Sequence, residues 1–159
     1  MIDQQTHQKV GVAKCEVPVI SVNYPVKSFD PVDLGLNLST DFNFLTVAQM
    51  GPRKNVPATI EAFVEEFHDD ENVGLVLKVF HMACSTMDRI FVKQQLAEAL
   101  KRWPDRKCKI HLLHGYMSPE ELHALYKHPK AKAYLSATHG EGYGLPIFEA
   151  AYSGLPVVA

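Results

Sequence analysis

The chain has 159 residues, of which 47% are hydrophobic and 21% are charged, and its formal net charge is −2. These values describe one ordinary globular domain that is large enough to bury a core. The near-neutral charge and the lack of a basic arm argue against nucleic acid as a partner. No apolar run has the length of a membrane span, so we expect no transmembrane segment, and no signal-peptide pattern opens the chain.

Metal-binding patterns are missing from the sequence. Cys15, Cys84 and Cys108 are widely spaced, which indicates reduced cytosolic thiols and not a disulfide framework or a metal site. The eight histidines show no ligand spacing, and no Asp-x-Asp occurs. We therefore predict no metal and no cofactor, and a cytoplasmic protein.

The first forty residues carry weak patterns. Residues 1–16 are polar and indicate an edge or a frayed end. Residues 17–22 are strand-like, although a proline among them favours an edge strand. The turn formers that follow predict a surface loop. We therefore expect an N-terminal segment over residues 1–40 and one domain over residues 41–159.

Strands and helices alternate through the rest of the chain. Apolar runs predict strands over residues 42–50, 73–80, 108–114 and 131–136. Helical spacing predicts helices through the rows Ile60–Phe63–Val64–Phe67, Val92–Leu96–Leu100–Trp103, Leu122–Leu125 and Leu145–Phe148–Tyr152. Their ends are indicated by Asn55 as a possible N-cap, capping patterns at Ser85–Asp88 and Ser118–Glu121, and stops at Pro104 and Gly154.

This alternation predicts an α/β fold with a Rossmann-like, doubly wound parallel sheet. Ligands of such sheets bind beyond the carboxyl ends of the strands. Three segments fall there and are candidates for a site: residues 51–55, 114–118 and 139–145.

The segment from Gly140 to Pro146 has the character of an anion-binding loop. Gly140, Gly142 and Gly144 alternate, which allows positive φ angles and close approach of the backbone to a ligand. Pro146 suits the first turn of a helix, whose N-terminal amides and dipole attract a phosphate.

Two carboxylates flank this loop, Glu141 inside it and Glu149 in the helix. An anion site has no electrostatic use for acids of its own. Sugar and ribose hydroxyls, in contrast, donate strong hydrogen bonds to carboxylates. Phosphate on the amides and hydroxyls on the acids together indicate a nucleotide-sugar ligand.

Three ordered segments carry a resemblance to a known family. The run E-G-Y-G-L-P-I-F-E-A-A-Y-S-G-L-P-V-V at residues 141–158 resembles the donor-binding signature of retaining glycosyltransferases of the GT-B type, called family 4 or group 1. V-A-Q-M-G-P-R-K-N at residues 47–55 and L-H-G-Y-M-S-P-E-E-L-H-A-L-Y at residues 113–126 are similar to two further segments of that family. The resemblance implies the C-terminal half of a GT-B fold, truncated at its own C-terminus, and therefore a fragment whose N-terminal GT-B domain is missing. It also implies that residues 1–40 include a hinge-like linker and that residues 41–159 form an incomplete donor-binding domain.

The resemblance also implies how the diphosphate is held. Lys54 matches the family's diphosphate-binding lysine, and Glu141 would hold hydroxyls of the transferred sugar, so these two residues are the catalytic candidates. The family's usual arginine falls at Gln49 in this sequence, and Arg53 is the candidate replacement. A solvated turn at Arg53 and Lys54 is the alternative.

Further donor-binding candidates follow from the same resemblance. Glu149 would bind the ribose, although a glutamate in a first helical turn is also stabilised by the dipole. The backbone around the sugar loop, His139, and the base-contacting turn complete the set, which comprises Gly140, Gly142, Tyr143, Gly144, Leu145, Tyr116 and Met117. Tyr116 and Met117 could equally be packing residues. Lys78 near a strand end could reach the ligand or extend into solvent.

The function that the resemblance implies is a donor-binding domain of a retaining, metal-independent glycosyltransferase. It would move a hexose from a nucleoside diphosphate to an acceptor sugar, lipid or protein, with the base unspecified. The full-length protein could then be peripheral at the membrane. The alternative is a non-catalytic nucleotide-sugar binding or regulatory module, and a GT-B epimerase or phosphorylase stays open. A dinucleotide-dependent oxidoreductase is disfavoured because G-x-G-x-x-G fails after Gly144.

Overall fold

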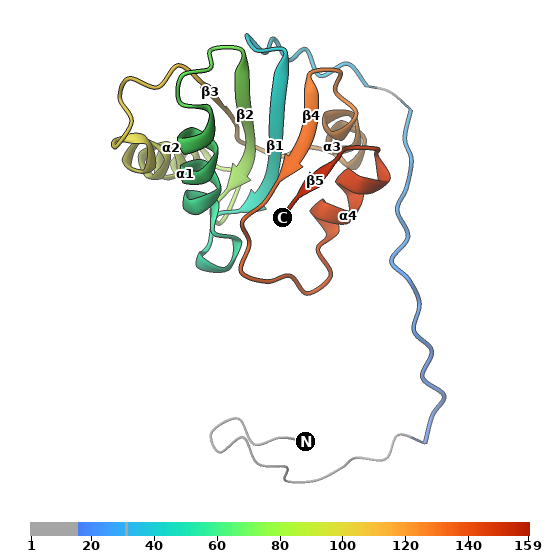
Figure 1. Cartoon of the computed structure of the whole chain (residues 1–159). Helices are drawn as coiled ribbons and strands as arrows, with labels where there is room; N and C mark the ends of the chain where they lie inside the picture. The colour runs from blue at the N-terminus through green and yellow to red at the C-terminus, as the bar shows by residue number, and fades with distance from the viewer. Residues whose placement is uncertain (1–15, 31) are drawn as a thin grey trace, which may run out of the picture.

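A five-stranded sheet with helices on both faces forms the domain (Figure 1). The computed structural model describes residues 16–30 and 32–159. The strands are β1 (Phe42–Gln49), β2 (Val73–Phe80), β3 (Lys109–Leu113), β4 (Ala131–Leu135) and β5 (Val157–Val158). The helices are α1 (Val56–Phe67), α2 (Thr86–Leu100), α3 (Pro119–Tyr126) and α4 (Leu145–Tyr152), with a 3₁₀ turn η1 (Pro52–Lys54) before α1. None of these helices in the described ranges is long and apolar enough to cross a membrane.

All strand pairs are parallel, and the strand order is β3-β2-β1-β4-β5. The order therefore reverses between β1 and β4. From β1 the chain adds β2 and then β3 on one side of β1. It adds β4 and β5 on the other side. This confirms the predicted α/β fold with a doubly wound parallel sheet.

Side-chain alternation along β2 explains its apolar sequence, which is interrupted only at Lys78. Val73, Leu75, Leu77 and Val79 pack with α1 and α2 in one core. Val76, between them, packs with α3 and α4 in a second core on the opposite face. A strand covered on both faces needs no polar side.

Several predicted helix ends are confirmed. The hydroxyl of Ser85 accepts a hydrogen bond from the Asp88 amide at the start of α2. Ser118 and Glu121 form a complete capping box at α3. Gly154, with φ 91°, follows α4 in the left-handed conformation that ends a helix.

The predicted strand over residues 17–22 is wrong. Residues 16–30 contain no helix or strand, and Val19, Ile20 and Val22 are at least 80% exposed. β-branched residues favour an extended backbone, but a strand forms only where a neighbouring edge pairs with it. The prediction for residues 1–16 lies, apart from its last residue, outside the described residues, as does Cys15.

Two helix predictions need correction. In α4 the apolar row Leu145–Phe148–Tyr152 does not face the core, because Phe148 and Tyr152 are 42% and 56% exposed. The helix instead packs through Ala150, whose small side chain lets its backbone approach the sheet, and through Ile147. The helix α2 ends at Leu100, so Trp103 lies beyond it.

One packed contact in the sheet is testable through Gly74. A Cβ at Gly74 would lie 2.3 Å from Asn43 Oδ1 and 2.6 Å from Thr40 Oγ1, in a buried polar network. Gly74→Ala should therefore lower the free energy of unfolding by about 1–3 kcal/mol, measured by urea denaturation. Gly51→Ala is the matched control, since nothing lies within 4 Å of its added Cβ. Equal stability of the two variants would contradict the expected clash.

Candidate functional site

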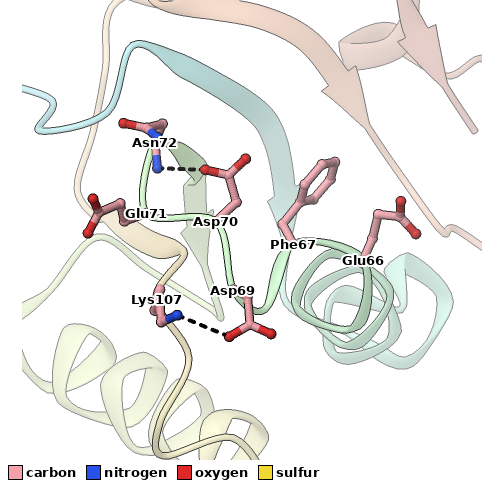
Figure 2. Close-up of a pocket in the computed structure, with 7 residues that line it drawn as sticks. All are labelled: Glu66, Phe67, Asp69, Asp70, Glu71, Asn72 and Lys107. Carbon is pink, nitrogen blue, oxygen red and sulfur yellow. Dashed lines mark hydrogen bonds and ion pairs between the residues drawn. The ribbon is translucent and has the colours of Figure 1, made fainter.

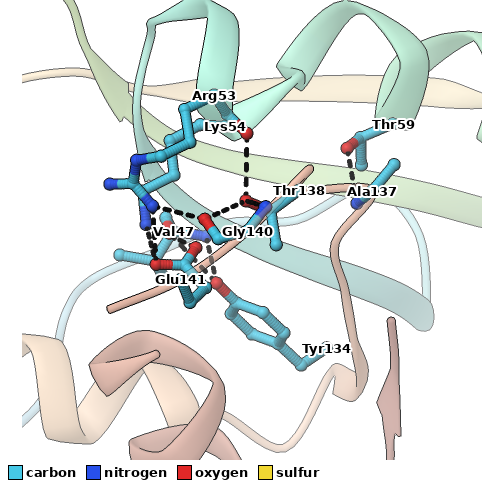
Figure 3. Close-up of polar contacts among 9 residues, drawn as sticks. All are labelled: Val47, Arg53, Lys54, Thr59, Tyr134, Ala137, Thr138, Gly140 and Glu141. Atoms are coloured by element: carbon cyan, nitrogen blue, oxygen red, sulfur yellow. Dashed lines mark hydrogen bonds and ion pairs between the residues drawn. The ribbon is translucent and has the colours of Figure 1, made fainter. Parts of the chain in front are cut away.

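The site is built on an ion pair between two loops that leave the carboxyl ends of β1 and β4. Lys54 Nζ lies 2.6 Å from Glu141 Oε1 and 2.7 Å from Glu141 Oε2, so both carboxylate oxygens accept from one ammonium (Figure 3). Both side chains are largely buried, at 16% and 17% exposure. Residues 87 positions apart in the sequence thus meet at the point where the strand order reverses.

Arg53 adds a second cation to this site. Its Nη1 donates to the Gly140 carbonyl at 2.5 Å and lies 3.1 Å from Glu141 Oε2. The side chain is 57% exposed, so its outer part faces solvent. Gln49, at the position where the family's arginine was expected, donates instead to the His81 carbonyl at 2.8 Å.

Backbone and hydroxyl contacts hold the two loops together. The His139 amide and the Thr138 hydroxyl both donate to the Arg53 carbonyl, at 2.9 and 3.1 Å. Asn55 donates to the Ala137 carbonyl at 3.0 Å, and the Ala137 amide donates to Thr59 at 3.1 Å. These bonds fix the positions of Arg53 and the following lysine relative to the glycine-rich loop (Figure 3).

The predicted N-cap role of Asn55 changes accordingly. Asn55 precedes α1 as predicted, but its φ is 49° and its side chain makes no capping bond. Its amide is committed to the other loop instead. Asn tolerates the left-handed conformation better than most residues, and here this frees its side chain for a contact between loops.

The electrostatic environment favours an ionised Glu141. Burial alone would raise the pKa of Glu141, but hydrogen bonds from Lys54 and Arg53 outweigh it, and the pKa is lowered. The site without ligand therefore contains two cations and one carboxylate that partly neutralises them.

Glu149 has the opposite environment. Burial raises its pKa, and a hydrogen bond from the Tyr126 hydroxyl at 3.3 Å opposes this effect only in part. The neighbouring Tyr134 donates to the Val47 carbonyl at 3.0 Å. Burial raises the pKa of Tyr134, and the charges of Glu141 and Glu149 raise it further. Both carboxylates therefore act on one tyrosine and border the same region.

The glycine-rich loop has one special backbone conformation. Gly144 has φ 74° and begins the turn into α4. Gly140 and Gly142 do not have positive φ, so of the three glycines only Gly144 uses the conformational freedom that they allow. Tyr143 is 54% exposed and packs edge-on against Phe148, with ring centroids 5.9 Å apart. Leu145 is the first residue of α4, and Pro146 lies in its first turn as predicted.

The turn after β3 places its two candidate residues differently. Tyr116 is 79% exposed, whereas Met117 packs against the core formed with α3 and α4. Lys78 is buried, at 8% exposure, so it does not extend into solvent. His139 is exposed. Within the described residues, its one contact with the site is the hydrogen bond from its backbone amide to the Arg53 carbonyl.

Sequence reasoning missed Tyr126, Tyr134 and Thr138. The two tyrosines were expected only as parts of a helix and a strand, yet their hydroxyls bond to Glu149 and to the β1 backbone. A tyrosine among buried positions needs a partner for its hydroxyl, and that requirement was the available signal.

A second concave region lies at the opposite end of the sheet, where β2 and β3 begin. It is lined by Glu66, Phe67, Asp69, Asp70, Glu71, Asn72 and Lys107 (Figure 2). Lys107 pairs with Asp69, and Asp70 accepts from the Asn72 amide. The excess of carboxylates would repel a phosphate. Across the described ranges, no three His, Cys, Asp or Glu side chains gather as a metal site would require.

The fold and the candidate site together define a Rossmann-like domain whose charged side chains gather at the switch point of the sheet. Residues 35–159 match the family described as glycosyl transferases group 1. The chain is 32% identical over 116 residues to the serotype-specific mannosyltransferase WbdA of Escherichia coli, and 31% identical to two more proteins of that name. The chain therefore belongs to the group 1 glycosyl transferases. The first match covers 73% of this chain and 13% of the relative, so the chain spans a small part of that protein.

Two solved structures share the fold. The C-terminal domain of a group 1 glycosyl transferase family protein, LpcC from Francisella tularensis, aligns with a TM-score of 0.59 and 21% identity, covering 74% of this chain and 57% of that one. The apo structure of OtsA aligns with a TM-score of 0.53 and 13% identity, covering 73% and 27%. The architecture matches that of GT-B glycosyltransferase C-terminal domains.

The environments of the two glutamates predict opposite effects on stability. Glu141 has a folded-state pKa below its ordinary value of about 4.3, so its ionised form stabilises the fold above that value, and stability is lost as the pH falls through the folded-state pKa. Glu141→Gln should lower the free energy of unfolding by about 1–2 kcal/mol at pH 7 and by less at pH 3. Urea denaturation at both pH values measures this.

Glu149→Gln is the matched control. The pKa of Glu149 is raised, so its ionised form costs stability once the pH exceeds its ordinary value. This variant should be as stable as the wild type at pH 7, or more so. A loss at pH 7 equal to that of Glu141→Gln would contradict the contrast between the two sites.

Proposed function

We propose that this chain is the donor-binding domain of a retaining, metal-independent glycosyltransferase that takes a hexose from a nucleoside diphosphate sugar. The observation that carries the proposal is the meeting of Lys54 and Glu141 at the switch point. A cation for the diphosphate and an acid for sugar hydroxyls lie together at the edge where parallel sheets bind ligands.

The diphosphate would be held by cations and backbone amides. Among the described residues, Lys54 forms an ion pair with Glu141 only, which neutralises part of its charge. The exposed part of Arg53 is available to a ligand. The start of α4 adds N–H groups and the positive end of its dipole. Charge that develops on the leaving phosphate would meet these fixed positive groups, which is an effective way to stabilise a transition state. Arg53 would thereby take the place of the arginine expected at Gln49.

Binding of the donor would reorganise the ion pair. Phosphate oxygens would compete for Lys54, and the Glu141 carboxylate would turn part of its hydrogen bonding to hydroxyls of the sugar. The pair keeps the site ordered and partly neutral before the donor arrives. Glu141 and Lys54 are thus the residues that we assign to the transfer step.

The ribose would lie at Glu149. Within the part of the chain that the structure describes, its carboxylate has one weak partner, the Tyr126 hydroxyl at 3.3 Å, and it is only partly buried. A carboxylate with unused acceptor capacity and a raised pKa gains when two ribose hydroxyls donate to it. Beyond it, Tyr116 and Met117 would border the base, and the loop from His139 to Leu145 would border the sugar.

The acceptor would be bound by a second domain. Members of a GT-B fold hold the acceptor in an N-terminal domain, and this chain spans 13% of its first curated relative. We propose that the full-length protein carries out the retaining transfer to a sugar, a lipid or a protein. We also propose that it is cytoplasmic and peripheral at a membrane. Because the relatives are named mannosyltransferases, mannose is the hexose that we propose to test first. The isolated chain should not turn over, since acceptor positioning supplies much of the rate.

Titration of the chain with UDP, GDP and ADP should show weak binding of at least one nucleotide. Calorimetry or NMR measures it, and circular dichroism verifies that the protein is folded. Absence of binding by folded protein at about millimolar ligand, the weak limit of useful affinity, would refute the proposed function.

Two variants should separate the halves of the ligand. Lys54→Met removes the charge for the diphosphate, so it should weaken nucleotides and inorganic pyrophosphate alike, by about tenfold or more. Glu149→Ala removes the carboxylate that would accept hydrogen bonds from the ribose. It should therefore weaken the binding of nucleotides and leave the binding of pyrophosphate unchanged. Equal losses of both ligands for Glu149→Ala would contradict its assignment to the ribose.

A further inference from the structure

Lys78 is a buried cation that the proposed donor contacts do not use. It lies in β2 opposite Val47 of β1 and Leu113 of β3, and it is 8% exposed. Alternation along β2 places it on the same face as Val76, which packs with α3 and α4. The sheet and these helices therefore enclose a charged side chain close to the carboxyl edge.

Among residues 16–30 and 32–159, the charge of Lys78 has no acidic partner. No carboxylate of the described residues lies within ion-pair distance of it, and its ammonium donates to the carbonyl of Gly115. Burial lowers the pKa of Lys78, although Cys84 and Glu121 oppose the shift. A buried ammonium is costly, and an apolar side chain would serve better if the position only filled space.

The Gly115 carbonyl begins the turn that follows β3. Gly115 has φ 124°, a conformation that a side chain would disfavour. Met117 anchors the other end of the turn by packing against the α3 and α4 core. Tyr116 lies between these two fixed points and is 79% exposed at the carboxyl edge. An exposed aromatic ring held at both sides suits stacking with a nucleobase.

We propose that Lys78 is a positioning residue that sets the nucleoside fit of the donor site, by holding the Gly115 carbonyl and thereby the turn that carries Tyr116. This inference rests on the proposed function, because it places the base of the donor at that turn. It assigns to β2 a part in the choice of nucleotide. The diphosphate half, built on Lys54, is independent of it.

Binding measurements on Lys78→Met test the proposal, with Lys109→Met as the control. Methionine keeps the length of the side chain without its donor, and Lys109 is an exposed lysine of the neighbouring strand. Lys78→Met should lower the affinity for the preferred nucleoside diphosphate about tenfold. It should also reduce the differences in affinity among UDP, GDP and ADP, and leave the affinity for pyrophosphate unchanged. Lys109→Met should change none of these. An equal loss of pyrophosphate, or no loss of nucleotide, would overturn the proposal.

A double-mutant cycle with Tyr116→Ala separates positioning from general damage. If Lys78 acts through the turn, Lys78→Met should add little to the loss of nucleotide affinity already caused by Tyr116→Ala. Additive losses would show that Lys78 acts elsewhere and would reject the inference.

Amide hydrogen exchange tests the contact without any ligand. Exchange at residues 115–117 should be faster in Lys78→Met than in Lys109→Met, while α1 is unchanged; equal exchange would overturn the proposal. This readout remains decisive if the wild type binds no nucleotide, an outcome that would refute the proposed function by itself. Should Lys78→Met fail to fold, side-chain NMR of wild-type Lys78 replaces it. The Lys78 signals should shift with nucleotide and not with pyrophosphate, and the reverse result would count against the inference.

Discussion

The ion pair between Lys54 and Glu141 is the interaction on which this site depends. In a doubly wound sheet the loops after β1 and β4 leave neighbouring strands and turn to opposite faces, so a crevice opens between them. The pair closes that crevice electrostatically, and the bonds from Thr138, His139 and Asn55 set the distance between the loops. The same contacts that hold the two loops together place two cations, Arg53 and Lys54, at the carboxyl edge of the sheet.

The two glutamates have opposite electrostatic environments within the candidate site. Glu141 is held ionised by the cations beside it and partly neutralises them. Glu149 is set among tyrosines, where burial raises its pKa and leaves acceptor capacity unused. Both acids flank the same glycine-rich loop, and their bonding partners distinguish them. Each environment suits a different part of the nucleotide-sugar that we propose as the ligand.

The sequence was sufficient wherever a local pattern and a general rule of parallel sheets agreed. The apolar run of β2, the capping box at Ser118 and the encounter of Lys54 with Glu141 all follow from such agreement. Prediction failed where tertiary packing decided between local options. Residues 17–22 have strand propensity without a pairing edge, and α4 packs through Ala150 in place of its larger apolar row.

The bonding partners that no sequence pattern revealed lie below the surface of the candidate site. Tyr134 and Lys78 are interior residues of strands, and their polar atoms bond to backbone carbonyls of β1 and of the turn after β3. Such partners are distant in sequence and carry no residue identity, so spacing cannot show them. Because buried polar groups must find partners, each interior hydroxyl or ammonium fixes a segment of backbone at the carboxyl edge. The proposed nucleotide site would in this way take part of its shape from polar groups in the core of the sheet.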